Sequence, residues 1–369
     1  MKILLPLDLF YPSKLGGPAN TLYWLAKAFT NVGIDVSVVT SNKFIEDKDI
    51  KYNEWVNIDK IRVRYCTGGG KLSYKIIWYS IKEMRKCHVV LFSSICFLPN
   101  LFILLFALLF QKKVLWSPRG ELFESAINSN KWKLLYFRLI RHLITKKVVF
   151  HATSQDEKKC IEKYFPYSDI IIIPNYMELP QKMARQKNLQ PYLLYVGRIA
   201  PIKALDHLIK ALAQSHVFLA SNFVLKIVGD VEEQFKSYYD ELIQLINENG
   251  LMQRVEFVGP RFGKEKYQMF SNAYFSFLVS KSENFGNVVL ESLSQGTPVV
   301  ASLGTPWEVL IYEKAGFWIN NDINSIATCI DNILNISVDE YSIFRKNAYL
   351  LSMKYDVNMN ISAWKKILN

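Results

Sequence analysis

Cysteine is scarce in this sequence, and its cysteines follow no pattern of a metal site or a disulfide framework. Five occur among 369 residues, and no two have the Cys-x-x-Cys spacing. We therefore expect a reducing compartment, no zinc site and no disulfide bonds.

A long hydrophobic run and a signal peptide are also missing. The longest apolar run has ten residues, 101–110, whereas about 20 are needed to span a bilayer, so a buried helix is expected there. Pro6 and Asp8 interrupt the first apolar segment at once, which is not the pattern of a cleaved leader.

Acidic residues are few in the first half of the chain. Residues 1–180 have a net charge of +11, whereas residues 181–369 have +1, which predicts an anionic partner for the first half, either nucleic acid or an acidic membrane. Segments 73–87 and 131–144 favour a membrane, because each would form a helix with a basic side beside aromatic residues. On a helical wheel, the apolar side of the second segment lies opposite its basic side, and an ordinary helix would bury it in the core. That apolar side contains Trp132, Leu135, Leu139 and Leu143.

The remaining pattern alternates short apolar strands with amphipathic helices, and half of the residues are hydrophobic. This predicts an α/β fold with two Rossmann-like, doubly wound domains facing across a cleft. A polar, basic linker at 178–190 separates domain 1–180 from domain 181–354, and a C-terminal helix at about 355–369 could pack back on the first domain. Candidate strands are 2–5, 36–40, 89–92, 113–117, 148–152, 170–173, 192–196, 225–228, 255–258, 275–279 and 298–301.

Two glycine-containing loops could receive phosphate. Gly16-Gly17-Pro18 follows the first strand, where the start of a helix could bind an anion, although a plain turn is equally compatible. The motif is not Gly-x-Gly-x-x-Gly, and no acidic residue ends the second strand. Both absences disfavour a dinucleotide-dependent oxidoreductase. Arg198 and Lys203 follow the strand that ends at Gly197, where two cations would suit a diphosphate. A pair of solvated charges is the alternative.

A third motif is more specific. Glu283 lies on a loop after strand 275–279, and Phe285-Gly286-Asn287-Val288 opens a helix whose first amides could hold phosphate oxygens. Glu291 lies inside that helix and can still face the ligand, where ribose hydroxyls could satisfy its carboxylate.

The order of these motifs resembles the GT-B-fold retaining glycosyltransferases of family 4 along nearly the whole chain. The resemblance also includes the segment Gly296-Thr297-Pro298-Val299-Val300-Ala301. Segments 116–122 and 305–308 look like a branch common in bacterial surface-polysaccharide gene clusters. By this resemblance, Arg198 and Lys203 would hold the donor diphosphate, and the amides of 286–288 would bind phosphate and sugar oxygens. Glu291 would bind the ribose, and Glu283 would bind the transferred sugar. Gly17 would approach the phosphate from the other domain.

The sequence departs from the family at several positions. The family often has His before Gly120, where this chain has Arg119, so Arg119 is a candidate contact to donor or acceptor. Family glycines are replaced by Ala204, Val231 and Tyr176, which predicts altered loop shapes rather than lost activity.

The resemblance implies transfer of a hexose or N-acetylhexosamine, from a UDP-sugar rather than a GDP-sugar, to a glycan or lipid-linked acceptor in O-antigen, capsule or exopolysaccharide synthesis. No cofactor, metal or nucleic acid is expected, and the enzyme would be cytoplasmic and peripheral at the inner face of the plasma membrane. Asp47 and Asp49 resemble a metal motif but fit a solvated loop, and His151 fits a satisfied core residue. A same-fold nucleotide-sugar epimerase and, less favoured, a Rossmann oxidoreductase are the alternatives.

Overall fold

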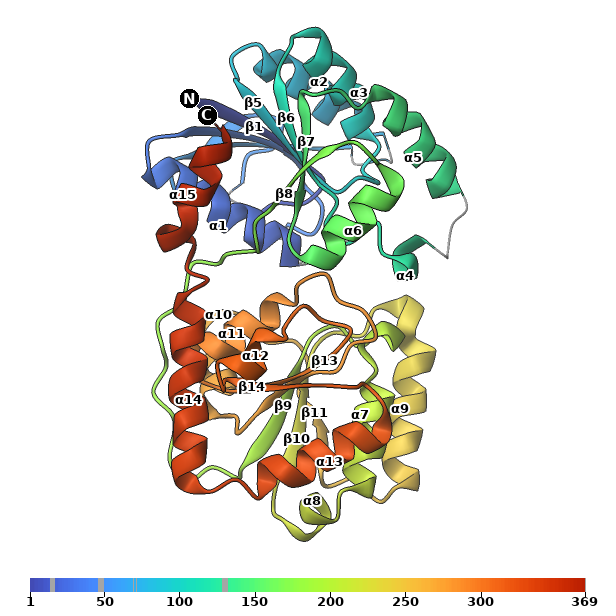
Figure 1. Ribbon diagram of the computed structural model, residues 1–369, viewed down its shortest axis with the longest axis vertical. Coiled ribbons are helices and arrows are strands. Elements are labelled where there is room, and N and C mark those ends of the chain that lie inside the picture. Colours follow the sequence, from blue (N-terminus) through green and yellow to red (C-terminus); the bar gives the residue numbers. More distant parts are fainter. Residues whose placement is uncertain (14–16, 46–49, 69, 71, 128–131, 369) are drawn as a thin grey trace. The chain divides into compact units, whose positions relative to one another are not determined.

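The computed structural model describes residues 1–13, 17–45, 50–68, 70, 72–127 and 132–368. It divides into two compact units, of which the first contains Met1–Glu178 with Val357–Asn369 and the second contains Leu179–Asp356. Each unit has a mainly parallel β-sheet covered by helices on both faces (Figure 1). This confirms the predicted α/β class with two Rossmann-like domains.

The sheet of the first unit has the strand order β3-β4-β2-β1-β5-β6-β7-β8. Neighbouring strands are parallel except β3 and β4, which form an antiparallel pair at one edge. The strands are β1 (Lys2–Leu7), β2 (Asp35–Ser41), β3 (Trp55–Ile58), β4 (Ile61–Cys66), β5 (Val89–Ser93), β6 (Lys113–Ser117), β7 (Val148–Ala152) and β8 (Asp169–Ile172).

Two groups of helices cover this sheet, each with its own apolar core. One core is built from α2, α3, α5 and α6, and the other from α1 and α15, the last helix of the chain. On α15, Trp364 packs edge-on against Phe29 of α1, with ring centroids 6.0 Å apart. The helices are α1 (Gly17–Asn31), α2 (Tyr74–Met84), α3 (Pro99–Leu109), α4 (Glu124–Ile127), α5 (Trp132–Leu143), α6 (Gln155–Tyr164) and α15 (Val357–Leu368).

The second unit has a fully parallel sheet with the order β11-β10-β9-β12-β13-β14. Its strands are β9 (Tyr192–Val196), β10 (Val224–Val228), β11 (Val255–Phe257), β12 (Ser276–Leu278), β13 (Val299–Ser302) and β14 (Gly316–Ile319). Its helices are α7 (Leu205–Gln214), α8 (His216–Ala220), α9 (Lys236–Glu248), α10 (Gly263–Asn272), α11 (Asn287–Ser294), α12 (Val309–Tyr312), α13 (Ile323–Leu334) and α14 (Val338–Met353).

The apolar segment 101–110 forms much of α3, but the prediction of a buried helix is only half right. Ile103, Leu104 and Ala107 are fully buried, whereas Leu105 and Leu109 are 46% and 70% exposed. Within the described ranges, no helix is long and apolar enough to cross a membrane.

His151 of β7 is a hydrogen-bonded core residue, as its apolar surroundings predicted. Its Nε2 lies 2.8 Å from the carbonyl oxygen of Ile173, which can only accept, so Nε2 donates and Nδ1 accepts from the Ser117 hydroxyl at 2.9 Å. Burial and then the positive charge of Arg119 lower the pKa of His151 to about 3. The ring is therefore neutral in the folded protein down to strongly acidic pH.

This depressed pKa predicts a stability that falls with pH. The unfolded ring binds a proton below pH 6.5 and the folded ring does not, so stability is fully present above pH 6.5 and is lost as the pH falls toward 3. The free energy of unfolding should drop by about 1 kcal/mol between pH 6.5 and 5.5 from this residue alone. When the free energy of unfolding is measured with urea at each pH, this part of its pH dependence should be missing in His151→Gln and present in His216→Gln, a change at an exposed histidine. An equal pH dependence in both variants would contradict the assignment.

Candidate nucleotide-sugar site

The loop between β12 and α11 in the second unit has a conformation that requires glycine. Gly286 lies directly before α11 with a φ of 77°, and a Cβ there would lie 2.6 Å from Cδ2 of Leu278. The indole Nε1 of buried Trp307 donates to the carbonyl oxygen of Phe285, and the two rings lie 5.1 Å apart. The amides of Asn287 and Val288 therefore begin the helix from a fixed loop, the geometry that suits a phosphate.

Lys203 and Glu283 form an ion pair beside this loop. Lys203 ends a short 3₁₀ turn after β9, and Glu283 follows the neighbouring strand β12. The two loops are joined because the Lys281 amide donates to the Ile202 carbonyl oxygen at 2.8 Å. The side chains are only 13% and 19% exposed, so the charges interact in a partly desolvated site.

Arg198 lies nearby in sequence but has a different partner. Its Nη1 is 3.1 Å from Oε1 of Glu232, and its side chain is 56% exposed. The backbone here is tightly packed, since a Cβ on Gly229 would lie 1.9 Å from the carbonyl oxygen of Gly197. A short 3₁₀ helix begins at Pro201, and α7 begins only at Leu205, after a residue in the left-handed region, Ala204, with a φ of 52°.

Glu291 is buried on α11, and its partner was not predicted from the sequence. Lys266 of α10 places its Nζ 2.7 Å from Oε1 of Glu291, and the two side chains are 17% and 9% exposed. Nothing in the spacing of these residues indicated the pair, because it depends on how α10 and α11 pack. The second unit thus presents two nearly buried cation–carboxylate pairs, one at each end of the Glu283–Glu291 motif.

In the first unit, Gly17 is the first residue of α1, and its carbonyl oxygen accepts from the Thr21 hydroxyl at 3.0 Å. Arg119 follows β6 with a φ of 58°, and its Nη1 donates to Oδ1 of Asn175 at 2.6 Å. Burial lowers the pKa of Arg119 to about 10. Gly16 and the Asp47–Asp49 motif lie outside the described residues.

Comparisons with known proteins match part of the chain to a family of glycosyl transferases and the whole chain to a known fold. Residues 180–351 match the family model of Glycosyl transferases group 1, a span that lies entirely in the second unit. Solved structures with the same two-unit architecture cover essentially the whole chain, which shows the GT-B fold.

Among those structures, sucrose-phosphate synthase from Thermosynechococcus elongatus has a TM-score of 0.78 at 18% identity, covering 100% of this chain and 98% of that chain. Anabaena HepE in complex with UDP and glucose has a TM-score of 0.77 at 18% identity, covering 99% of each chain. At such identities the likeness concerns the fold. A D-inositol 3-phosphate glycosyltransferase of Actinosynnema mirum is 36% identical over 113 residues, which are 30% of this chain and 27% of the relative.

Proposed function

We propose that this chain is a retaining, metal-independent glycosyltransferase that uses a UDP-sugar. The observation that carries the proposal is the cluster at the start of α11, where Lys203 pairs with Glu283 and Lys266 pairs with Glu291 around the Gly286 loop. A cation beside helix-end amides, as at Lys203 and the Gly286 loop, suits a leaving diphosphate. HepE, which has the same fold, was solved with UDP and glucose bound.

In this mechanism the charge that develops on the leaving diphosphate is stabilised by Arg198, Lys203 and the first amides of α11. Glu291 binds the ribose, and Glu283 contacts the transferred hexose or N-acetylhexosamine near the reacting carbon. The leaving phosphate oxygen takes the acceptor proton, so no protein base is required. In the first unit, Gly17 and Arg119 are the residues proposed to bind donor or acceptor.

The acceptor proposed is a glycan or lipid-linked glycan of surface-polysaccharide synthesis. Support comes from segments 116–122 and 305–308, which resemble that branch, and Trp307 of the second segment holds the Gly286 loop through Phe285. Since the inositol phosphate relatives are matched over only about a third of their length, their acceptor is a separate candidate to be tested beside a glycan.

A thermal-shift panel tests the donor. UDP and UDP-sugars should raise the melting temperature, and GDP-sugars at the same concentration should raise it less, because a ligand that binds only the folded state stabilises it by mass action. EDTA should leave the shift unchanged. A shift with NAD and none with any nucleotide sugar would refute the proposal in favour of an oxidoreductase.

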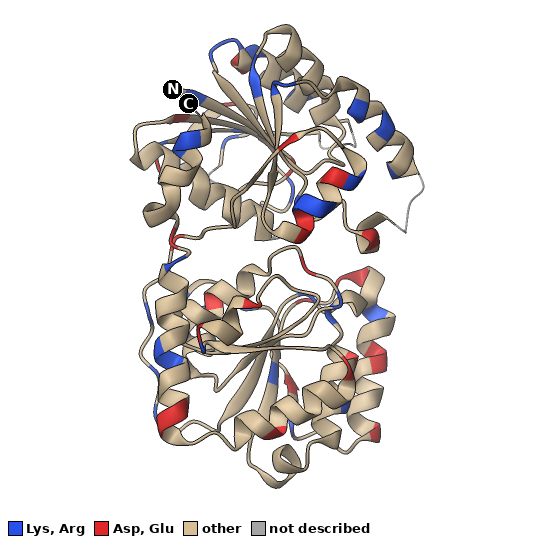
Figure 2. Ribbon diagram, viewed as in Figure 1, with Lys and Arg blue, Asp and Glu red and all other residues tan. Residues whose placement is uncertain are grey.

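We also propose that the first unit binds the inner face of the plasma membrane peripherally. Most of the apolar side of α5 faces solvent, so the expectation of a buried apolar side is wrong: Leu135, Leu139 and Trp132 are 71%, 52% and 47% exposed, and of this side only Leu143 packs against the core. The same core is covered by α2 and α3, whose Trp78 and Leu109 are 61% and 70% exposed. Helix α5 carries Lys and Arg but no acid (Figure 2), which suits anionic headgroups.

Sedimentation with liposomes tests this surface. Binding should require anionic lipid, weaken with salt, and drop both in Lys82→Glu/Arg85→Glu/Lys86→Glu and in Leu135→Ser/Leu139→Ser, since basic and apolar contacts both contribute. Met359→Ser removes an equally exposed apolar side chain from α15, on the other face of the sheet, and should bind normally. Equal recovery with neutral and anionic liposomes at low salt would rule the surface out.

A further inference from the structure

Arg119 makes few hydrogen bonds for a partly buried guanidinium. Among the described residues its single hydrogen bond is the one to Asn175, and its buried Nε has no partner. A guanidinium has five N–H donors in a planar fork, so most of them are unused by the protein. Unpaired polar groups in such surroundings are costly, and they mark positions where a ligand completes the hydrogen bonding.

The positive charge of Arg119 also has no ion-pair partner in the described part of the first unit. The carboxylate whose charge acts on it is that of Glu157, but no ion pair joins the two. Glu157 accepts from the Gly120 amide at 2.7 Å and from the amide and hydroxyl of Thr153 at 2.7 and 2.8 Å.

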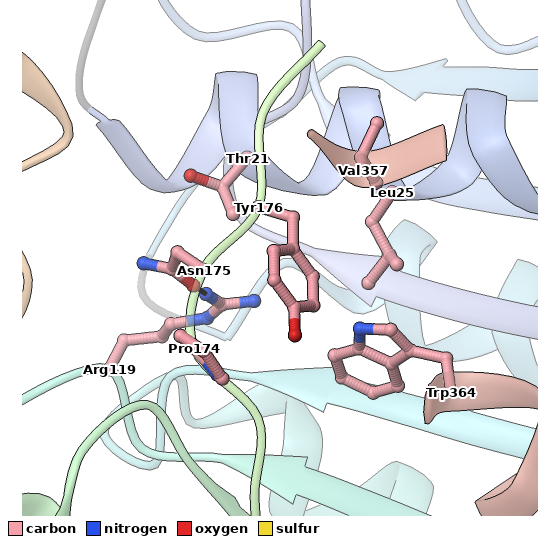
Figure 3. Close-up of a pocket in the computed structure, with 8 residues that line it drawn as sticks. All are labelled: Thr21, Leu25, Arg119, Pro174, Asn175, Tyr176, Val357 and Trp364. Atoms are coloured by element: carbon pink, nitrogen blue, oxygen red, sulfur yellow. Dashed lines mark hydrogen bonds between the residues drawn. The ribbon is translucent and has the colours of Figure 1, made fainter. Parts of the chain in front are cut away.

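The guanidinium lies at a small recess formed by four segments of the first unit. Thr21 and Leu25 come from α1, Asn175 and Tyr176 from the segment after β8, and Trp364 from α15. Figure 3 shows the guanidinium beside Asn175 and directed toward Tyr176. Asn175 accepts from one nitrogen of the fork through Oδ1, and the free end of the fork faces the recess beside Tyr176.

We propose that Arg119 is a receptor for an anionic oxygen group of a substrate, a carboxylate or a phosphate, and that Asn175 positions it. A planar fork binds either group through two parallel hydrogen bonds. The anion has two possible sources: the transferred sugar, as a uronic acid, or the acceptor, as a sugar or polyol phosphate. The inference rests on the proposed function and adds to it the charge of a substrate.

Calorimetric titration of the full chain separates these sources by comparing matched probes. UDP-glucuronate against UDP-glucose tests the sugar, and D-inositol 3-phosphate against inositol, with UDP present, tests the acceptor. One anionic probe should bind about tenfold to a hundredfold more tightly than its neutral partner, because of the charge-assisted hydrogen bonds. Inorganic phosphate titrated alone tests the receptor even if no nucleotide binds, so failure of the proposed function is distinguishable.

Two variants test the receptor, one by removing the guanidinium and the other by pairing it with a carboxylate of the protein. Arg119→Gln should abolish the preference for the anionic probe, while Arg141→Gln, an exposed charge at the end of α5, should keep it. Asn175→Asp retains Arg119 but places a carboxylate against its fork, so it should also abolish the preference. No preference in the wild type, or the same preference in folded Arg119→Gln and Asn175→Asp, would overturn the proposal.

Discussion

Replacing Glu283 with glutamine is expected to lower kcat about a hundredfold, the size of effect typical for one lost electrostatic contact to a transition state. The affinity for free UDP should not fall. Glu283 is proposed to contact the sugar, and it also pairs with Lys203, so the variant releases that cation for the diphosphate. Loss of turnover without loss of nucleotide affinity is the signature of an interaction made in the transition state.

The matched control is Glu232→Gln, which releases Arg198 in the same way but at a more exposed pair. It should change turnover little, because Glu232 has no proposed contact with the sugar. Both variants are measured by steady-state kinetics and by calorimetric titration with UDP. Normal turnover in Glu283→Gln, or a matching loss of UDP affinity, would refute the role assigned to Glu283.

The double variant Arg198→Ala/Lys203→Ala should bind UDP about a hundredfold more weakly than the wild type. A charged hydrogen bond contributes about 1.5–3 kcal/mol, which is roughly tenfold or more for each cation. Lys203 should account for the larger share, because its side chain is 13% exposed and that of Arg198 is 56% exposed.

A double variant with the same charge change provides the comparison. Lys210→Ala/Lys236→Ala removes two exposed lysines from α7 and α9 of the same unit and should bind UDP normally. Using UDP rather than a UDP-sugar keeps the sugar contact of Glu283 out of the measurement. Unchanged UDP affinity in Arg198→Ala/Lys203→Ala would show that these cations do not hold the diphosphate.

The parts of the site that local sequence could predict are those at strand-to-helix junctions. A strand followed by a glycine and a helix fixes where Glu283, Gly286 and Glu291 lie along the chain, and the structure places them there. Strand β4 was missed because its two arginines break the apolar pattern. Both arginines stack on Trp55 of β3, with guanidinium-to-ring distances of 4.4 and 4.8 Å, which only the paired strands bring together.

Contacts between distant segments could not be predicted. Lys266 reaches Glu291 across two packed helices, and Asn175 reaches Arg119 across 56 positions of sequence. The prediction that the basic side of α5 lies opposite its apolar side is wrong, because Arg138 and His142 line the same surface recess as Leu135 and Leu139. A helical wheel also contains no information on which side the sheet covers. The sheet covers the side with Tyr136, Phe137 and Ile140, which leaves Leu135 and Leu139 in solvent.

The chain returns to the first unit after completing the second. The Val357 amide donates to the Met177 carbonyl oxygen at 3.0 Å, so the points where the chain leaves the first unit and re-enters it are neighbours. The second unit is therefore an insertion carried by a single break in the first. A short peptide joining residue 178 to residue 357 would close that break without stretching either end, and residues 179–356 form one uninterrupted segment that can be transferred as a cassette.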